Sequence, residues 1–197
     1  MSGIRARKAK LRTQILRTRG ELTPEERESA ALALTKRVRG LPECSGEGSV
    51  AAYASMGTEP GTGPLIEAMR SAGTRVLLPV LLPDNDLDWA EYLGPDTLVR
   101  TERGLFEPTG PRLGPDAVTG VRLILLPGLA VDAQGVRLGR GGGSYDRVLD
   151  RVRQAGTRPA LVVVLYAHEV VASVPNEPHD HLVDAALTPE GLHRVSA

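Results

Sequence analysis

The sequence predicts an α/β fold of three layers, with helices on both faces of a mostly parallel sheet and further helices before it. Two observations predict this class. Residues 123–126 and 161–165 are uninterrupted apolar runs, as the central strands of a parallel sheet require. Segments with helical spacing alternate with strand-like segments along the chain, which is the element order of α/β proteins.

The N-terminal part is expected to be helical, beginning with a first helix at about residues 4–18. A second helix follows a clear start signal: Thr23 suits the N-cap, Pro24 the first helical position and Glu26 the third. Gly40 is expected to end this second helix, because glycine is the usual residue just past a helix C-terminus.

The remaining elements are shorter. We expect strands at residues 50–53, 75–79, 88–92 and 185–187, helices at residues 64–72 and from about residue 145, and a long ordered loop over residues 94–120. The alternating pattern of residues 88–92 predicts an edge strand or a hairpin. A length of 197 residues with 41% apolar residues supports one domain, residues 1–197, in which residues 1–40 form a helical part packed on the α/β core.

Composition argues against several classes of protein. No apolar run approaches the ~18 residues of a membrane span, and the basic N-terminus lacks the apolar stretch of a secretory signal. A formal net charge of zero argues against a protein built for nucleic-acid binding. Cys44 is the one cysteine and can form no internal disulfide. We therefore expect a cytoplasmic protein, monomeric, without a nucleic-acid or membrane partner.

The most informative segment is residues 137–146, which read Arg-Leu-Gly-Arg-Gly-Gly-Gly-Ser-Tyr-Asp. The glycines bare backbone N–H groups, and Arg137 and Arg140 supply charge that suits phosphate oxygens. A glycine loop between a buried strand and a helix is where α/β proteins hold phosphate. The segment is neither a P-loop nor a complete Rossmann fingerprint. A mobile surface loop or an Arg-Gly segment touching nucleic acid therefore stays open.

Residues 1–20 are basic and contain no acid. Lys8 and Arg12 are four residues apart and share one helix face, beside an apolar stripe of Leu11 and Ile15. Such a helix docks by its apolar edge and points cations into an anion site. The alternative is a solvated basic face.

The glycine segment has companions in a fixed order. Before it stand residues 8–12, Tyr53 with Glu59, and residues 126–132, which read Leu-Pro-Gly-Leu-Ala-Val-Asp. After it come residues 175–180, which read Pro-Asn-Glu-Pro-His-Asp. In this order and spacing the chain resembles the 5-formyltetrahydrofolate cyclo-ligases, also called 5,10-methenyltetrahydrofolate synthetases. The likeness covers nearly the whole chain, and the glycine segment with its Pro-Gly and Asp is its most specific part.

The resemblance implies a three-layer α/β fold and a reaction that uses ATP and Mg²⁺. The family converts 5-formyltetrahydrofolate to 5,10-methenyltetrahydrofolate, with release of ADP and phosphate, through a phosphorylated formyl group.

The resemblance also assigns site residues. Folate falls to Ala54, Glu59 and Tyr145, magnesium to Asp146 and Asp180, and catalysis to Arg140 and Tyr145. The nucleotide is assigned to a larger set: Lys8, Arg12, Arg137, Gly139, Arg140, Gly141, Gly142, Gly143, Ser144, Tyr145 and Asp146.

Several of these residues also have a purely structural interpretation. Asp146 could cap the next helix, Asp180 could stabilise a turn, and Glu59 could merely solvate its loop. Trp89 is expected to be a packed or half-exposed aromatic rather than a ligand wall.

Two other catalytic arrangements are unsupported. Ser144, His168 and Asp146 lack the nucleophile elbow of a serine triad. His168, His179 and His181 fit no zinc spacing.

Three positions depart from the family pattern. Ser144 stands where an aromatic usually precedes the loop tyrosine, Arg103 replaces an aromatic ahead of Glu107, and Glu169 replaces a glutamine. These changes put the aromatic wall of the folate site in doubt, although Phe106 is close in sequence. None of the three removes a phosphate or metal group.

Two other functions remain as alternatives. One is a non-catalytic nucleotide- or folate-binding protein of the same fold. The other is an RNA-binding protein that uses the basic N-terminus, against which the neutral net charge and the shortage of aromatic platforms count.

Overall fold

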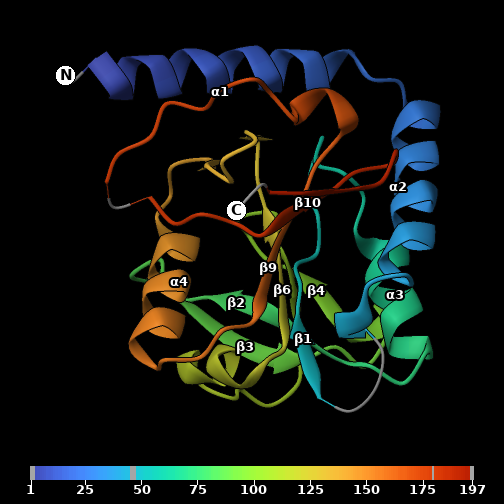
Figure 1. The fold of residues 1–197 in the computed structure, drawn as a ribbon. Helices are drawn as coiled ribbons and strands as arrows, with labels where there is room; N and C mark the ends of the chain where they lie inside the picture. Colours follow the sequence, from blue (N-terminus) through green and yellow to red (C-terminus); the bar gives the residue numbers. More distant parts are fainter. Residues whose placement is uncertain (1–2, 45–47, 179, 196–197) are drawn as a thin grey trace.

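The computed structural model describes residues 3–44, 48–178 and 180–195. A seven-stranded sheet lies at its centre, with strand order β11-β10-β9-β6-β1-β2-β3 (Figure 1). All neighbours from β10 to β2 are parallel, and only the edge strands β11 and β3 are antiparallel. The predicted three-layer α/β class is therefore confirmed.

The strands of this sheet are short, and the apolar runs form its middle. The bounds are β1 Ser49–Ala51, β2 Arg75–Leu81, β3 Leu87–Glu91, β6 Leu123–Pro127, β9 Ala160–Val164, β10 Ala185–Leu187 and β11 Leu192–Arg194. The apolar run 123–126 lies in β6 and is buried throughout, because helices cover both of its faces. β3 pairs with β2 alone, so the edge position predicted for residues 88–92 is confirmed.

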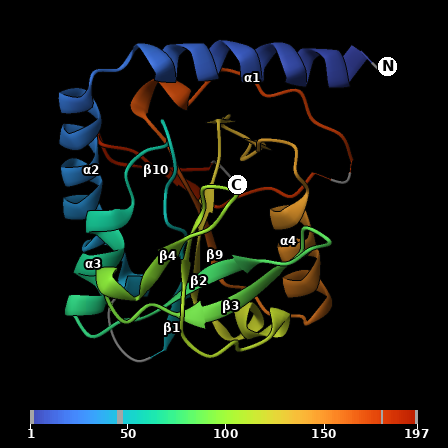
Figure 2. The same cartoon turned by 180° about the vertical axis from the view of Figure 1, so that it is seen from behind.

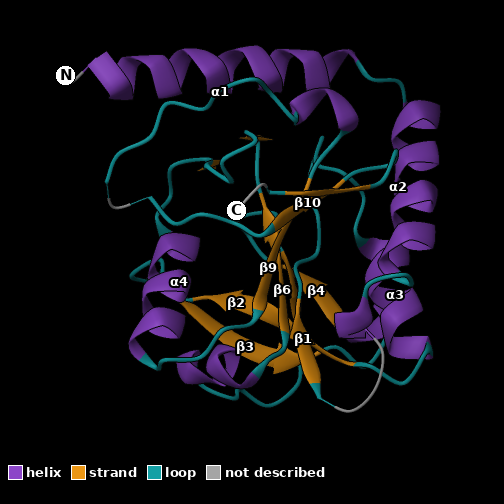
Figure 3. Cartoon of the chain, viewed as in Figure 1, coloured by secondary structure: helices purple, strands orange, loops and turns teal. Residues whose placement is uncertain are grey.

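Helices pack on both faces of the sheet (Figure 3). α2, Pro24–Val38, and α3, Gly63–Ser71, cover one face. α4, Ser144–Gln154, covers the other together with the 3-10 helix Pro115–Gly120. The start signal of α2 forms as predicted: the Thr23 side chain accepts from the Glu26 N–H, and the Glu26 carboxylate accepts from the Thr23 N–H.

α1, Gly3–Glu21, runs across one end of the molecule, as two opposite views show (Figures 1 and 2). Three of its side chains are buried, those of Lys8, Ile15 and Arg19. Ile15 packs on the small hairpin of β7, Ala130–Val131, and β8, Arg137–Leu138. Two of these three buried side chains are charged, so α1 is attached to the core by polar contacts as well as by apolar packing. None of the helices among the described residues is long and apolar enough to cross a membrane.

Several short elements were not predicted. The long loop over residues 94–120 contains a hairpin of β4, Leu98–Arg100, and β5, Phe106–Pro108. β7, β8 and β11 were also missed, and the glycine loop therefore follows the β7–β8 hairpin rather than β6 directly. Strands of two or three residues are too short to show a hydrophobic period.

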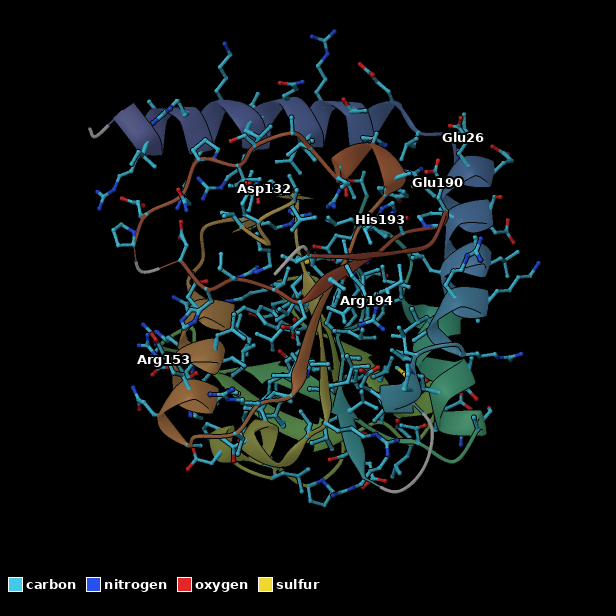
Figure 4. All side chains as sticks on the ribbon, viewed as in Figure 1. Glu26, Asp132, Arg153, Glu190, His193 and Arg194 are labelled. Carbon is cyan, nitrogen blue, oxygen red and sulfur yellow. The ribbon has the colours of Figure 1, made fainter. Side chains whose placement is uncertain are left out.

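Asp132 of the Pro-Gly…Asp motif has a structural role beneath α1 (Figure 4). It is buried, and its carboxylate accepts hydrogen bonds from the N–H groups of Gln134, Val136 and Val174. This carboxylate therefore holds the β7–β8 turn and fastens the segment after Val171 to it.

Candidate active site

A cavity of about 430 Å³ lies at the end of the sheet where the parallel strands β1 and β6 finish. Ala54 and Glu59 enter it from the segment after β1, and the glycine loop with the start of α4 forms the opposite wall. Crevices beyond the carboxyl ends of parallel strands are the usual ligand sites of α/β proteins. The residues predicted for this wall all line it: Arg137, Gly139, Arg140, Gly141, Gly142, Gly143, Ser144, Tyr145 and Asp146.

The glycine loop contains two positions whose backbone conformation favours glycine. Gly141 has φ +92° and Gly143 has φ +77°, which is left-handed backbone. Gly143 also takes the N-cap position of α4, where it makes no side-chain bond to the helix. No side chain of the N-cap residue therefore covers the first N–H groups of α4, and Gly143 and Ser144 line the cavity, as expected of an anion site at a helix N-terminus.

Arg137 lies in the wall of the cavity with only 7% of its side chain exposed. One guanidinium nitrogen donates to the Pro127 carbonyl at 3.0 Å and the other to the Asp146 carboxylate at 3.1 Å. Burial lowers the Arg137 pKa, while Asp146, Tyr145 and Asp180 oppose that shift. Both predicted magnesium carboxylates thus act on one buried cation.

Lys8 and Asp180 come together although 172 positions separate them. The Lys8 ammonium lies 2.6 Å from one Asp180 oxygen and 3.0 Å from the other, and it lies 3.3 Å from Glu177. The Asp180 carboxylate also accepts from the Glu177 N–H, so the turn role considered from the sequence is present as well. The solvated-face interpretation of Lys8 is therefore wrong.

Arg12 reaches the glycine loop from α1. Its Nε donates to the Gly139 carbonyl at 2.9 Å, and its guanidinium lies about 3.5 Å from where a Gly141 side chain would begin. A helix at the N-terminus thus supplies a cation to a loop more than a hundred residues away.

Glu59 is held firmly at the cavity. Its side chain is only 8% exposed; one oxygen accepts from the Met56 N–H at 2.9 Å and the other lies 3.2 Å from Arg140 Nε. The Tyr166 hydroxyl donates to the backbone carbonyls of Thr58 and Glu59. The idea that Glu59 merely solvates a loop is wrong.

Two tyrosine hydroxyls at the cavity are buried without a partner among the described residues, those of Tyr145 and Tyr53. Burial and the nearby Glu59 carboxylate raise the pKa of both phenols. Both hydroxyls therefore keep their protons at neutral pH and can donate.

The three departures from the family pattern have separate outcomes. Glu169 is fully buried and forms an ion pair of 2.5 Å with Arg19, whose guanidinium also donates to the Gly128 carbonyl. Ser144 starts α4 at the cavity wall, so no ring stands there. Arg103 is exposed and reaches Asn85, whereas Phe106 lines the cavity and supplies an aromatic surface.

The described histidines of the serine triad and of the zinc cluster considered above have other contacts. His181 lies 3.1 Å from Asp150, His168 stacks on Tyr166, and His179 lies outside the described residues. Trp89 is fully buried, as expected of a packed aromatic. Asp146 is not the N-cap of α4, because Gly143 is.

The carboxylates near the cavity fit Mg²⁺ only if a bound ligand supplies further oxygen atoms. Among the described residues no three His, Cys, Asp or Glu side chains gather into a cage. Mg²⁺ is commonly held by one or two carboxylates together with substrate phosphates. Asp146 and Asp180, both close enough to act on Arg137, meet that lesser requirement.

An α/β fold with a cavity at the carboxyl edge of its parallel strands, lined by apolar and charged side chains, is typical of α/β enzymes. A family model described as the 5-formyltetrahydrofolate cyclo-ligase family matches residues 4–189. The chain belongs to this family and is an enzyme of the ligase class.

Individual proteins that are similar to this chain have names that match the family. The chain is 39% identical over 188 residues to a 5-formyltetrahydrofolate cyclo-ligase of Mycolicibacterium smegmatis, covering 93% of this chain and 94% of the relative. Identity to that of Escherichia coli strain K12 is 33% over 179 residues, covering 89% and 96%. The solved 5,10-methenyltetrahydrofolate synthetase of Aquifex aeolicus superposes with a TM-score of 0.81 at 29% identity, covering 96% of this chain and 93% of that one.

Sequence reasoning noted Phe106, which lines the cavity, but missed two contributors to this region: Tyr53 as a cavity hydroxyl and Arg19 as the partner of Glu169. The sequence held one signal for the last, the charged Glu169 at a position that the resemblance gives to glutamine. Nothing in the sequence marked its partner.

Proposed function

We propose that the protein catalyses the ATP- and Mg²⁺-dependent conversion of 5-formyltetrahydrofolate to 5,10-methenyltetrahydrofolate, ADP and phosphate. The observation that carries this proposal is the single cavity shared by the glycine loop and Glu59. A triphosphate on the loop and a pterin on Glu59 would meet in that space. Membership of the cyclo-ligase family supports the same reaction.

The chemistry explains why these groups are needed together. The formyl oxygen takes the γ-phosphoryl group, N10 attacks the activated formyl carbon and loses its proton, and phosphate leaves as the ring closes. A formamide oxygen is a poor leaving group, and phosphorylation makes it expellable. Phosphoryl transfer needs positioning and charge neutralisation rather than covalent help from the protein. We assign neutralisation of the charge on the transferred phosphoryl group to Arg140. Arg137, in the wall of the same cavity, would assist it.

Tyr145 is proposed to orient the reacting oxygen. Tyr145 and Glu59 both line the cavity, and the Tyr145 hydroxyl is a buried donor without a partner among the described residues. A fixed donor aimed at a position where negative charge develops stabilises the transition state more than the ground state.

Magnesium is proposed to be held by Asp146 and Asp180 together with phosphate oxygens, whose negative charge it would draw away when bound. Lys8 occupies Asp180 in the ligand-free protein. A magnesium nucleotide carries both signs of charge, so its phosphates can take Lys8 while its cation takes Asp180. Lys8 and Asp180 then both keep a partner of opposite charge. An anion without a cation would pair with Lys8 and leave Asp180 unpaired.

We also propose, from the sequence, a monomer that works in the cytoplasm. Its one cysteine, Cys44, is partly buried, and burial raises the pKa of its thiol to about 11, so the thiol is unreactive.

The test follows the absorbance of methenyltetrahydrofolate formed from 5-formyltetrahydrofolate, with and without Mg-ATP. We expect formation only with both ATP and Mg²⁺, together with one ADP for each ring closed. Binding of both ligands without ring closure would favour the non-catalytic protein. Binding of neither would refute the proposal.

A further inference from the structure

Tyr53 offers the cavity a hydrogen-bond donor that nothing in the described protein uses. Its side chain is 4% exposed, its ring lies in the cavity wall, and its hydroxyl has no partner among the described residues. A buried hydroxyl without a partner lowers stability, so such groups in native proteins call for an explanation. The most direct one is a ligand atom that the hydroxyl meets.

The surroundings of Tyr53 separate it from Tyr145. The groups that act on the Tyr53 phenol are Glu59, Tyr145, Arg19 and Glu169. Those that act on Tyr145 are Glu59 and Arg137. Tyr145 therefore shares its surroundings with Arg137 of the glycine segment, whereas Tyr53 shares them with the buried Arg19–Glu169 pair.

The segment that carries both Tyr53 and Glu59 is rigid. The Thr62 hydroxyl donates to the Tyr53 carbonyl at 2.6 Å, and Ser55 and Thr62 each donate a backbone N–H to the hydroxyl of the other. The loop that carries the Glu59 carboxylate and the Tyr53 phenol is thus fixed, and both residues line the cavity.

This pair matches one edge of a pterin ring. That edge presents the 2-amino group and the N3–H as donors, followed by the 4-carbonyl oxygen as an acceptor. A carboxylate can accept from the first two, and a donor beside it is then needed for the third. We propose that Tyr53 is a further substrate-binding residue, whose hydroxyl donates to the 4-carbonyl oxygen of the folate while Glu59 accepts from the adjoining donors.

The proposal rests on the proposed function and deepens it. It gives Tyr53→Phe an unusual signature in two measurements. The ligand-free protein should melt at the same temperature or higher, because an unpartnered buried hydroxyl is removed without leaving a cavity. Affinity for 5-formyltetrahydrofolate should fall about two- to twelve-fold, the factor for one neutral hydrogen bond, while affinity for ATP stays unchanged.

Tyr92→Phe is the matched control. The Tyr92 hydroxyl is satisfied by Glu67 at 3.1 Å outside this cavity, so its loss should lower the melting temperature and leave folate affinity unchanged. A direct readout is the infrared stretch of the 4-carbonyl in bound, ¹³C-labelled 5-formyltetrahydrofolate. This stretch should move to higher frequency in Tyr53→Phe than in the unmodified protein.

An unchanged folate affinity in Tyr53→Phe, or an unchanged carbonyl stretch, would overturn the proposal. So would an equal loss of affinity for folate and ATP together with a lower melting temperature. Failure of the unmodified protein to bind 5-formyltetrahydrofolate is a different result, because it would refute the proposed function itself.

Discussion

At the scale of single residues, several positions of the cavity wall have a backbone conformation that few residue types adopt. The glycine loop shows this best, since the left-handed backbone at Gly141 lies next to the Arg12 guanidinium. The glycines and the loop cations were predicted from local loop chemistry and Glu59 from the family resemblance, and all of them line the cavity. The unpartnered hydroxyl of Tyr53 could not be predicted, since a partner or its absence depends on the whole fold.

Gly141→Val should abolish ATP binding while the protein stays folded. A branched side chain there would strain the backbone at φ +92° and crowd Arg12. Gly73→Val is the matched control, because Gly73 has φ +86° and open space around it, away from the cavity. Calorimetry with ATP should show loss of binding in the first variant only. Equal ATP affinity in both would remove the loop from the nucleotide site.

Asp146→Asn should raise the Mg²⁺ concentration needed for turnover and leave the ATP requirement at saturating Mg²⁺ nearly unchanged. Asp180→Asn should also raise the Mg²⁺ requirement and should leave the ATP requirement unchanged or lower, because Lys8 loses a competing partner. Asp150→Asn, one turn further along α4 and paired with Arg153, is the control and should titrate like the unmodified protein. A normal magnesium titration in Asp146→Asn would assign Asp146 to structure.

At the scale of elements, long and strongly patterned segments were predictable and short ones were not. α2 was predicted with its capping box and β6 with its burial, because each carries a complete local signal. The position of α1 was not predictable in detail. Its strongest tie is the buried ion pair of Arg19 with Glu169, which joins residues 150 positions apart. Sequence periodicity contains no information on such a pairing.

The two faces of α1 should differ in their effect on ATP use. Replacing Lys8 and Arg12 together by methionine removes the cations at Asp180 and Gly139, so the KM for ATP should rise at least ten-fold. Replacing the exposed Lys10 and Arg17 by methionine makes the same change in net charge and should have little effect. Steady-state kinetics at fixed Mg²⁺ compares the two. Similar KM values would mean that charge alone, rather than position, matters.

At the scale of the whole molecule, we propose that residues 1–197 unfold as one domain. α1 and α2 are tied to the sheet through Arg19 and through the apolar cluster of Leu34 and Val38. Trp89, the one tryptophan, is buried on the opposite face with α4. Its fluorescence and the far-UV circular dichroism of the helices should therefore change with a single midpoint in urea. Separate midpoints would show that the helical part unfolds independently.

The ion pair between Arg140 and Glu59 joins the glycine loop to the loop after β1, and we propose that it links the binding of the two ligands thermodynamically. The pair has to open before Arg140 can meet a phosphate or Glu59 can give that oxygen to a pterin, so the first ligand to bind bears the cost for the second. Either ligand should then raise the affinity for the other by the same factor, about five-fold or more. A non-hydrolysable ATP analogue allows this factor to be measured by calorimetry.

Glu59→Gln should remove that linkage as well as its own contact. Folate affinity should fall about ten- to a hundred-fold, the factor for a charge-assisted hydrogen bond, and ATP affinity should stay the same or rise because Arg140 no longer has a competing partner. Coupling that persists in Glu59→Gln would have to pass through another contact. In the intact protein, folate affinity measured without nucleotide would then understate the affinity that applies in a cell, where ATP is always present.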